Sequence, residues 1–181
     1  MGAATALLGG DLEKAYGRYF FDALTQDVFI SFDPNFRSDL WKNEEDVFVK
    51  KCMPFIEKSD LCKFSLEEAQ LLSGKNDLNE ACKILHQAGA KVITITLGSE
   101  GTLVSTSETK HTIPSIKVVP VDTTGAGDAF NGGFAAALAE GMAPLEAIRF
   151  ATATAAISVT RAGTAPSMPA RAEIDALLAS I

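Results

Sequence analysis

Short apolar runs alternate along this chain with longer segments in which apolar residues recur every three or four positions. The short runs are Val28–Phe32, Leu61–Phe64, Lys91–Leu97 and Thr102–Ser105. The first two are apolar runs whose length predicts buried strands, and Lys91–Leu97 alternates β-branched residues and is the clearest strand of the chain. The longer segments predict helices over Leu12–Leu24, Glu44–Glu57, Leu78–Ala88, Pro144–Val159 and Ala170–Ile181. Strands that alternate with helices in this way predict an α/β fold with a mostly parallel sheet flanked by helices.

Local signals indicate how some of these elements end and which side they bury. Ser65-Leu66-Glu67-Glu68 is typical of a capping box, with Ser65 as N-cap of another helix. Gly89 is expected just after the end of the Leu78–Ala88 helix. Helical spacing places the following side chains together on one side of the first and second helices: Ala15, Tyr19, Phe20 and Ala23 in the first, and Val47, Phe48 and Phe55 in the second.

The most informative stretch is Asp122-Thr123-Thr124-Gly125-Ala126-Gly127-Asp128-Ala129-Phe130. A β-like segment, Ile113–Val121, precedes it, and an apolar helical run, Phe130–Leu138, follows. A Gly-Ala-Gly turn that opens a helix leaves backbone N–H groups unpaired, and with the helix dipole they form an anion site. Glycine also lets a phosphate approach the backbone. Asp128 by itself is equally compatible with the carboxylate that first turns often carry.

Composition narrows the class of protein. A length of 181 residues favours one domain over residues 1–181, and 47% hydrophobic residues without an apolar run near the ~20 residues of a bilayer span predict a soluble chain. The N-terminus lacks the pattern of a signal peptide. Three cysteines without CxxC spacing predict buried thiols in a reducing cytoplasm. A net charge of −7 argues against nucleic acid or a membrane surface as a partner.

The Asp122–Phe130 stretch resembles the second signature of the ribokinase-like (PfkB) carbohydrate kinases, with Asp128 at the family's catalytic aspartate. The resemblance implies ATP-dependent phosphorylation of a sugar hydroxyl, with Mg²⁺ and a monovalent cation, K⁺, as further cofactors. The N–H groups of Gly125, Ala126 and Gly127 would then stabilise charge on the transferred phosphoryl group. Asp128 would accept the proton of the attacking hydroxyl.

A second string, Asp33-Pro34-Asn35-Phe36-Arg37 followed by Asp39-Leu40-Trp41, directly follows a predicted strand. Its residues are also ordinary turn formers. The string resembles the fructokinase branch of the family, which implies that Asn35 lies near the triphosphate and Arg37 near the transferred phosphate or the sugar. The 2-keto-3-deoxygluconate kinases carry a similar string, so fructose is the first expectation and other sugars, ribose included, stay open.

The resemblance extends to three further sets of residues. Ser65-x-x-Glu68 corresponds to the family's Asn-x-x-Glu pattern, which implies a place for Ser65 beside the nucleotide and an indirect role for Glu68 in organising Mg²⁺; the capping box is a sufficient explanation by itself. Thr94, Gly98 and Gly101 correspond to residues along the nucleotide, although Gly98–Gly101 also reads as a hairpin turn. The monovalent-cation site is expected at Asp122, Thr124, Gly163 and Ser167.

The resemblance covers nearly all of this chain but only the C-terminal, nucleotide-side part of the family. The family's N-terminal half carries most sugar-binding residues and a small lid. The expected partners are therefore a nucleotide and a small sugar, together with a second copy of the chain or a complementing N-terminal half. A non-catalytic nucleotide-binding fragment is the alternative. A dinucleotide-binding enzyme is disfavoured, because Phe130 stands where a third glycine is required.

Overall fold

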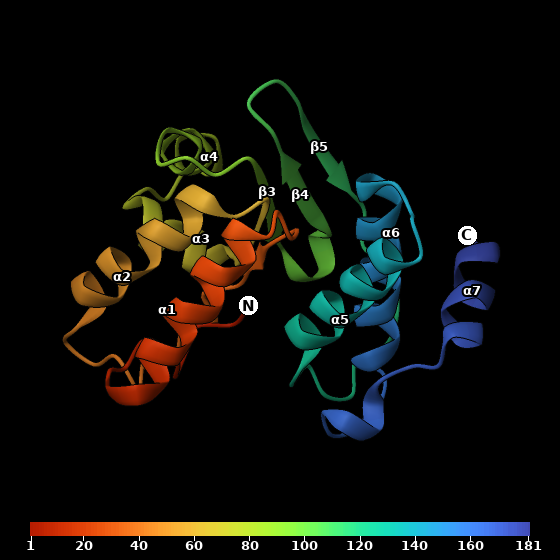
Figure 1. Ribbon diagram of the computed structural model, residues 1–181. Helices are drawn as coiled ribbons and strands as arrows, with labels where there is room; N and C mark the ends of the chain where they lie inside the picture. The colour runs from red at the N-terminus through yellow and green to blue at the C-terminus, as the bar shows by residue number, and fades with distance from the viewer. The chain divides into compact units, whose positions relative to one another are not determined.

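A computed structural model describes residues 1–181, which form two compact units. Unit 1 comprises residues 1–97 and 103–112, and unit 2 comprises residues 98–102 and 113–181. In Figure 1, unit 1 contains α1–α4 with nearly all of the sheet, and unit 2 contains α5–α7. Whether the chain behaves as a single folding domain stays a prediction.

The sheet has five strands in the order β1-β2-β3-β4-β5. Their bounds are Ser31–Phe32, Leu61–Ser65, Val92–Thr96, Thr102–Ser105 and Lys110–Ile113. β1 pairs in parallel with β2, and β2 in parallel with β3. The short connections into β4 and β5 complete a mixed sheet. The chain start adds one parallel bridge, Gly2 to Asp33, beside β1. The predicted α/β fold with a largely parallel sheet and flanking helices is therefore confirmed.

Four helices belong to unit 1: α1 (Gly10–Thr25), α2 (Glu45–Lys58), α3 (Leu66–Ser73) and α4 (Leu78–Gln87). The predicted capping box of α3 is present, since the Ser65 hydroxyl accepts the Glu68 N–H and the Glu68 carboxylate accepts the Ser65 N–H. Asp77 caps α4 through the N–H groups of Asn79 and Glu80. Gly89 has a φ of 107°, a left-handed backbone conformation that favours glycine after a helix.

One face of the sheet builds the apolar core of unit 1. The parallel register aligns Phe32 with Cys62, Cys62 with Ile93, and Phe64 with Ile95, so these side chains share a face. They pack with buried residues of α1–α4: Phe20, Phe48, Cys52, Phe55, Ile56, Ala69, Leu72, Cys82 and Leu85. The three cysteines are unpaired and buried, as predicted. The same register places Lys63 and Thr94 together on the other face.

Four details of the predicted pattern are wrong. The run Val28–Phe32 was expected to form one buried strand, but β1 comprises only Ser31–Phe32, and Val28 and Phe29 are exposed. Residues 114–121 form no strand; Pro114 and Pro120 have no N–H to donate, and β5 ends at Ile113. In α1, Tyr19 is 71% exposed although it was expected beside the buried Phe20. In α2, Val47 is 41% exposed, and Phe48, Cys52, Phe55 and Ile56 form the inner face instead. Helical spacing alone did not fix the exact direction of either buried face.

Unit 1 also exposes several large apolar side chains. Tyr19 and Phe21 of α1 are joined by Val28 and Phe29, which precede β1 and are 52% and 49% exposed. Leu8 and Leu12 add to this set. Where such side chains form a contiguous patch, they are typical of surfaces that contact other chains. No helix of the structure combines the length and the apolar character needed to cross a membrane.

Unit 2 contains α5 (Ala126–Ala139), α6 (Pro144–Ser158) and α7 (Arg171–Ala179). α5 and α6 pack closely along residues with small side chains. A Cβ atom on Gly133 of α5 would lie 2.5 Å from the Thr154 hydroxyl oxygen and 3.2 Å from the Cα of Ala151, both in α6. Glycine at position 133 therefore sets the distance between the two helices.

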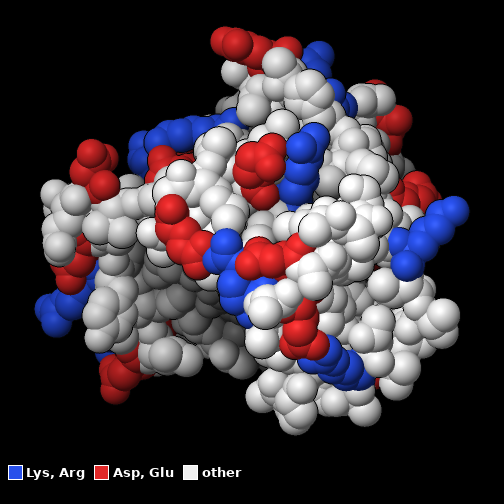
Figure 2. Space-filling model, turned by 90° about the vertical axis from the view of Figure 1, so that its right-hand side faces the viewer, with Lys and Arg blue, Asp and Glu red and all other residues white.

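The surface of unit 2 carries several ion pairs. Arg171 pairs with Glu140 and Asp175, and Arg161 pairs with Glu173. On the face shown in Figure 2, acidic and basic side chains lie next to one another rather than in separate patches. Exposed pairs of this kind contribute little to stability, because water and salt screen the charges. The stability of this unit therefore depends mainly on helix packing.

Gly133→Ala should destabilise unit 2, because the new methyl group overlaps α6. We expect the free energy of unfolding to fall by about 1–3 kcal/mol. Gly132→Ala is the matched control, since a Cβ on Gly132 would meet no atom within 4 Å. It should raise the stability by about 0.5–1 kcal/mol through helix propensity. Thermal unfolding of both variants measures the difference; equal shifts of the same sign would contradict the close packing.

Candidate functional site

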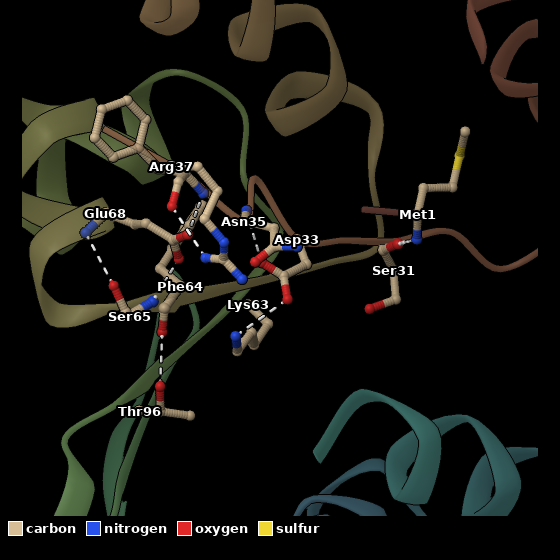
Figure 3. A network of polar contacts seen from close by, with 11 residues as sticks. Met1, Ser31, Asp33, Asn35, Arg37, Lys63, Phe64, Ser65, Glu68 and Thr96 are labelled. Carbon is tan, nitrogen blue, oxygen red and sulfur yellow. Dashed lines mark hydrogen bonds and ion pairs between the residues drawn. The ribbon is translucent and has the colours of Figure 1, made fainter. Parts of the chain in front are cut away.

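The loop after β1 is folded by its own side chains. Asp33 Oδ1 accepts the Asn35 N–H at 2.9 Å. Asn35 has a φ of 50°, a left-handed conformation that asparagine tolerates better than most residues. Figure 3 shows Asp33, Asn35 and Arg37 of this loop near Lys63 and Glu68, which come from β2 and α3. The loop thus brings the predicted Asn35 and Arg37 to the carboxyl end of a parallel strand pair, the usual ligand edge of such sheets.

A buried ion pair links this loop to β2. Lys63 Nζ lies 3.1 Å from Asp33 Oδ2, and the two side chains are only 8% and 7% exposed. Lys63 was not among the residues predicted for the site. The available signal was a lysine inside the otherwise apolar run Leu-Cys-Lys-Phe, because a charged residue within a buried strand needs a partner.

Glu68 joins the loop to α3. Its Oε1 accepts the Phe36 N–H and its Oε2 accepts the Ser65 N–H, both at 2.7 Å. Burial raises the pKa of the Glu68 carboxyl above its usual range, and the negative charge of Asp33 adds to the increase. The structure therefore brings Asn35, Ser65 and Glu68 together, with both Glu68 oxygens used in holding backbone.

The predicted threonine lies inside the sheet. Thr94 of β3 is fully buried, and its hydroxyl has no hydrogen-bond partner. It faces the same side as Lys63, its register partner on β2. The neighbouring Thr96 donates from its hydroxyl to the Phe64 carbonyl at 3.3 Å. An unpaired buried hydroxyl is rare, and beside Lys63 it marks a polar row on this face of the sheet.

The two glycines after β3 belong to a tight turn of unit 2. Residues Gly98–Glu100 form a single 3₁₀ turn. Gly101 has a φ of 105°, and a Cβ there would lie 2.1 Å from the Ile113 carbonyl oxygen. Only glycine fits this close approach of two backbone segments. For Gly101 a structural reason is therefore sufficient, whereas nothing lies within 4 Å of a Cβ on Gly98.

The Gly-Ala-Gly turn opens α5 as expected. Gly125 is the N-cap residue, with a φ of 80° and no capping side chain. The Ala126 N–H donates to the Thr123 carbonyl at 3.2 Å, whereas the N–H groups of Gly125, Gly127 and Asp128 have no acceptor within the protein. Unpaired N–H groups at the positive end of a helix suit a phosphate oxygen. The exposed Asp128 carboxylate makes no hydrogen bond or ion pair, so it does not cap the helix.

A second loop of unit 2 lies beside this turn. The Asp122 carboxylate accepts N–H bonds from Thr124 and Gly163, each at 2.9 Å. Hydrogen bonds from the Thr124 side chain and from these two N–H groups lower the pKa of Asp122. Ser167 is fully buried and donates its hydroxyl to the Thr164 carbonyl. Three of the four residues expected at a monovalent cation are thus connected directly, and Ser167 closes the adjoining turn.

No three His, Cys, Asp or Glu side chains are arranged to hold a metal ion. The resemblance to the family implied an indirect role for Glu68 in organising Mg²⁺. Its two backbone acceptor bonds are compatible with a positioning role.

Comparisons with known proteins agree with the predicted family. A model of the pfkB family carbohydrate kinases matches residues 3–171. Fructokinase-1 of Oryza sativa subsp. japonica is 31% identical over 97% of this chain and 56% of its own length. A ribokinase of Haemophilus influenzae is 43% identical over 59% of this chain and 36% of its own length. The crystal structure of a Vibrio cholerae O395 fructokinase, in a form with bound fructose, ADP and calcium, superposes with a TM-score of 0.86 at 27% identity, covering 98% of this chain and 59% of that chain. The chain spans about half the length of the curated relatives it matches.

The raised pKa of Glu68 predicts a pH-dependent stability. Between the ordinary value of 4.5 and the raised value, the folded protein binds more protons than the unfolded chain, so stability falls as pH rises through this window. The stability of Glu68→Gln should not fall with pH in this window. At every pH the variant should be less stable by about 1–3 kcal/mol, because one backbone N–H loses its acceptor.

Urea unfolding from pH 4.5 upward, followed by the fluorescence of the buried Trp41 in unit 1, measures this effect. Glu67→Gln is the control, because it removes an equal charge from the exposed neighbouring position. A stability difference between wild type and Glu68→Gln that does not change with pH would contradict the raised pKa.

Proposed function

Because the chain belongs to the pfkB family of carbohydrate kinases, we propose that it forms the nucleotide-side part of an ATP-dependent sugar kinase. The observation that carries the proposal is the start of α5. Unpaired N–H groups of Gly125 and Gly127 lie there next to the free carboxylate of Asp128. With this arrangement, one helical turn can bind a phosphate and also supply a carboxylate that accepts a proton.

Phosphoryl transfer asks the protein mainly to position groups and to stabilise charge. ATP supplies the phosphoryl group and Mg²⁺ neutralises its oxygens. The N–H groups of the Gly125–Gly127 turn bind the negative charge that develops on the transferred group, with Gly125 and Gly127 the more available donors. Asp128 orients the sugar hydroxyl and accepts its proton. An uncapped carboxylate suits this task, since all its acceptor capacity is free for substrate.

The residues of unit 1 hold the nucleotide end of the substrates in this proposal. Asn35 and Ser65 contact phosphate oxygens, and Glu68 organises Mg²⁺ indirectly by fixing the Phe36 and Ser65 backbone. Arg37 is exposed, and its only hydrogen bond is to the adjacent Phe36 carbonyl, which leaves most of its five donors free for phosphate or sugar. We assign Thr94 and the Gly98 and Gly101 turn to the nucleotide side as well.

We further propose K⁺ as a cofactor at the loops of Asp122, Thr124, Gly163 and Ser167. The support is the hydrogen bonding of Asp122 to both loops, which ties the cation region directly to the Gly125 turn. A cation there would stabilise the loop that presents the phosphate-binding N–H groups.

Fructose is the proposed sugar. The support is the Asp33–Arg37 loop and the fructokinases among the relatives. The ribokinase of Haemophilus influenzae, at 43% identity, favours a ribokinase-type substrate as the second candidate. A kinase that acts on 2-keto-3-deoxygluconate remains the third, because its loop motif is similar.

The length of the chain and its exposed apolar residues favour a partner. Since the chain spans about half of its relatives, we propose that a complementing N-terminal half or a second copy covers residues such as Leu12 and Tyr19. The chain alone should then transfer phosphate poorly, because in-line positioning of the acceptor is worth about 7–11 kcal/mol. A nucleotide-binding module without catalysis is the alternative function.

Mg²⁺ with ATP or ADP should raise the melting temperature of the chain. Binding to the folded state alone contributes about 2.7 kcal/mol of stability when the ligand is at 100 times its Kd. Gly127→Pro should reduce this increase, because it deletes one N–H donor while proline is tolerated in a first helical turn. Differential scanning fluorimetry with Gly132→Ala as control tests this. Full stabilisation of Gly127→Pro would argue against the turn as the phosphate site.

Asp128→Asn should separate binding from catalysis. In a protein of full family length that contains this segment, we expect kcat for fructose to fall about 10²–10⁴-fold while the Kd for ADP changes little. Coupled-enzyme kinetics and calorimetry measure the two quantities. Near-normal turnover would identify Asp128 as an ordinary first-turn carboxylate and would favour the non-catalytic alternative.

A further inference from the structure

A pocket in unit 1 lies apart from every residue assigned above. It has a volume of about 410 Å³ and lies between α4 and the connection from β4 to β5. Figure 1 shows α4 and this connection at the same end of the unit. Pockets that bind small molecules measure about 300–1,000 Å³, so the size suits a small ligand. Its lining comprises Asn79, Cys82, Lys83, His86 and Gln87 of α4, with Ser105, Thr106, Ser107 and Lys110.

The charge of the lining is unusual for this chain. The protein has 23 acidic against 16 basic residues, yet the pocket is lined by two lysines and a histidine and by no carboxylate. Lys83 forms no ion pair. Lys110 bonds only to the neutral Asn79 side chain, at 2.6 Å. Of its three N–H donors, two are therefore free. The nearest acids in sequence are directed elsewhere or are outside the lining: Glu80 faces Lys75, and Glu108 lies in the turn.

One wall of the pocket is held rigidly. His86 Nδ1 lies 2.7 Å from the Ala90 carbonyl oxygen, and His86 Nε2 lies 2.9 Å from the Ser105 hydroxyl. A carbonyl can only accept, so Nδ1 donates to Ala90, and Nε2 shares a hydrogen bond with the Ser105 hydroxyl, which also reaches the Thr106 carbonyl. The Lys110–Asn79 bond fastens the other end of the connection to α4. Because this wall is already ordered, little binding free energy would be spent on ordering it when a ligand binds.

Several donors of the lining have no partner within the protein. Lys83, Gln87 and Ser107 are exposed and form no hydrogen bond through their side chains within the protein. With the free N–H groups of Lys110, they offer ammonium, amide and hydroxyl donors together. Phosphate oxygens accept hydrogen bonds from all three kinds of donor. Hydrogen bonds in which the donor or the acceptor is charged are stronger than those between neutral groups.

We propose that this pocket binds the phosphate group of a small phosphorylated metabolite. Lys83 and Lys110 bind the phosphate, Ser107 and Gln87 donate to its oxygens, and the rest of the cavity receives the organic part. The proposal is independent of the kinase function, because none of its residues belongs to the nucleotide or sugar site. Exposed lysines are screened by salt, so the expected affinity is in the millimolar range, near −4 kcal/mol.

Titration of the ¹⁵N-labelled chain with fructose 6-phosphate, inorganic phosphate and sulfate tests the proposal. We expect saturable shifts of the amide signals of α4 and of residues 105–110 with the sugar phosphate. Lys83→Met with Lys110→Met should weaken this binding at least about 10-fold. Lys42→Met with Lys50→Met is the matched control, since both of these lysines are exposed, unpaired and in the same unit. The control should bind as wild type.

The three probes distinguish binding of a sugar phosphate from binding of phosphate alone and from unspecific attraction of anions. Equal affinity for inorganic phosphate and the sugar phosphate would support the phosphate contacts and overturn the role of the organic part. If sulfate and both phosphates shift the signals equally, and if the control variant loses these shifts as much as the pocket variant does, the binding is unspecific and the proposal is overturned. Absence of saturable shifts at 20 times the expected Kd would overturn it as well. Unchanged amide spectra of the variants away from the pocket verify that they are folded.

Discussion

The ion pair between Asp33 and Lys63 joins the loop after β1 to the neighbouring strand and fixes the carboxylate around which the start of the loop is folded. Removing one partner of a buried pair leaves an unpaired charge and typically costs about 3–5 kcal/mol. Here the cost would extend further, because Asp33 also accepts the Asn35 N–H and adds to the raised pKa of Glu68. The Lys63 ammonium also counteracts the effect of Asp33 on Glu68, so its removal would raise the pKa of Glu68 further.

The fold could be predicted from the sequence where local signals and burial agree. The α3 capping box and the β3 strand follow directly from residue type and spacing. The prediction was wrong where two physical effects oppose each other. Residues 114–121 are rich in β-branched side chains, but two prolines remove the N–H groups that a strand requires. The buried side of α1 depended on tertiary contacts of Phe20, which the helical period alone cannot supply.

The candidate site divides in the same way. The Gly125 turn could be predicted, because its glycines and its place before a helix describe backbone geometry. The lysine within the apolar run of β2 signalled that Lys63 needs a partner, but the partner could not be identified, since Asp33 lies 30 residues away in sequence. Likewise, the unpaired hydroxyl of Thr94 is visible only once the neighbours of β3 are known. Side chains that act across strands need the register, which the sequence alone did not provide.

The distribution of thiols has a practical consequence. Cys52, Cys62 and Cys82 are all buried in unit 1, and unit 2 contains no cysteine. Burial raises the pKa of Cys62 to about 12 and also raises that of Cys52, so their reactive thiolate forms are scarce while the unit is closed. The rate at which an alkylating reagent modifies the chain therefore reports how often unit 1 opens. Unit 2 has no thiol that the reagent could modify, so the alkylation rate measures the opening of unit 1 alone.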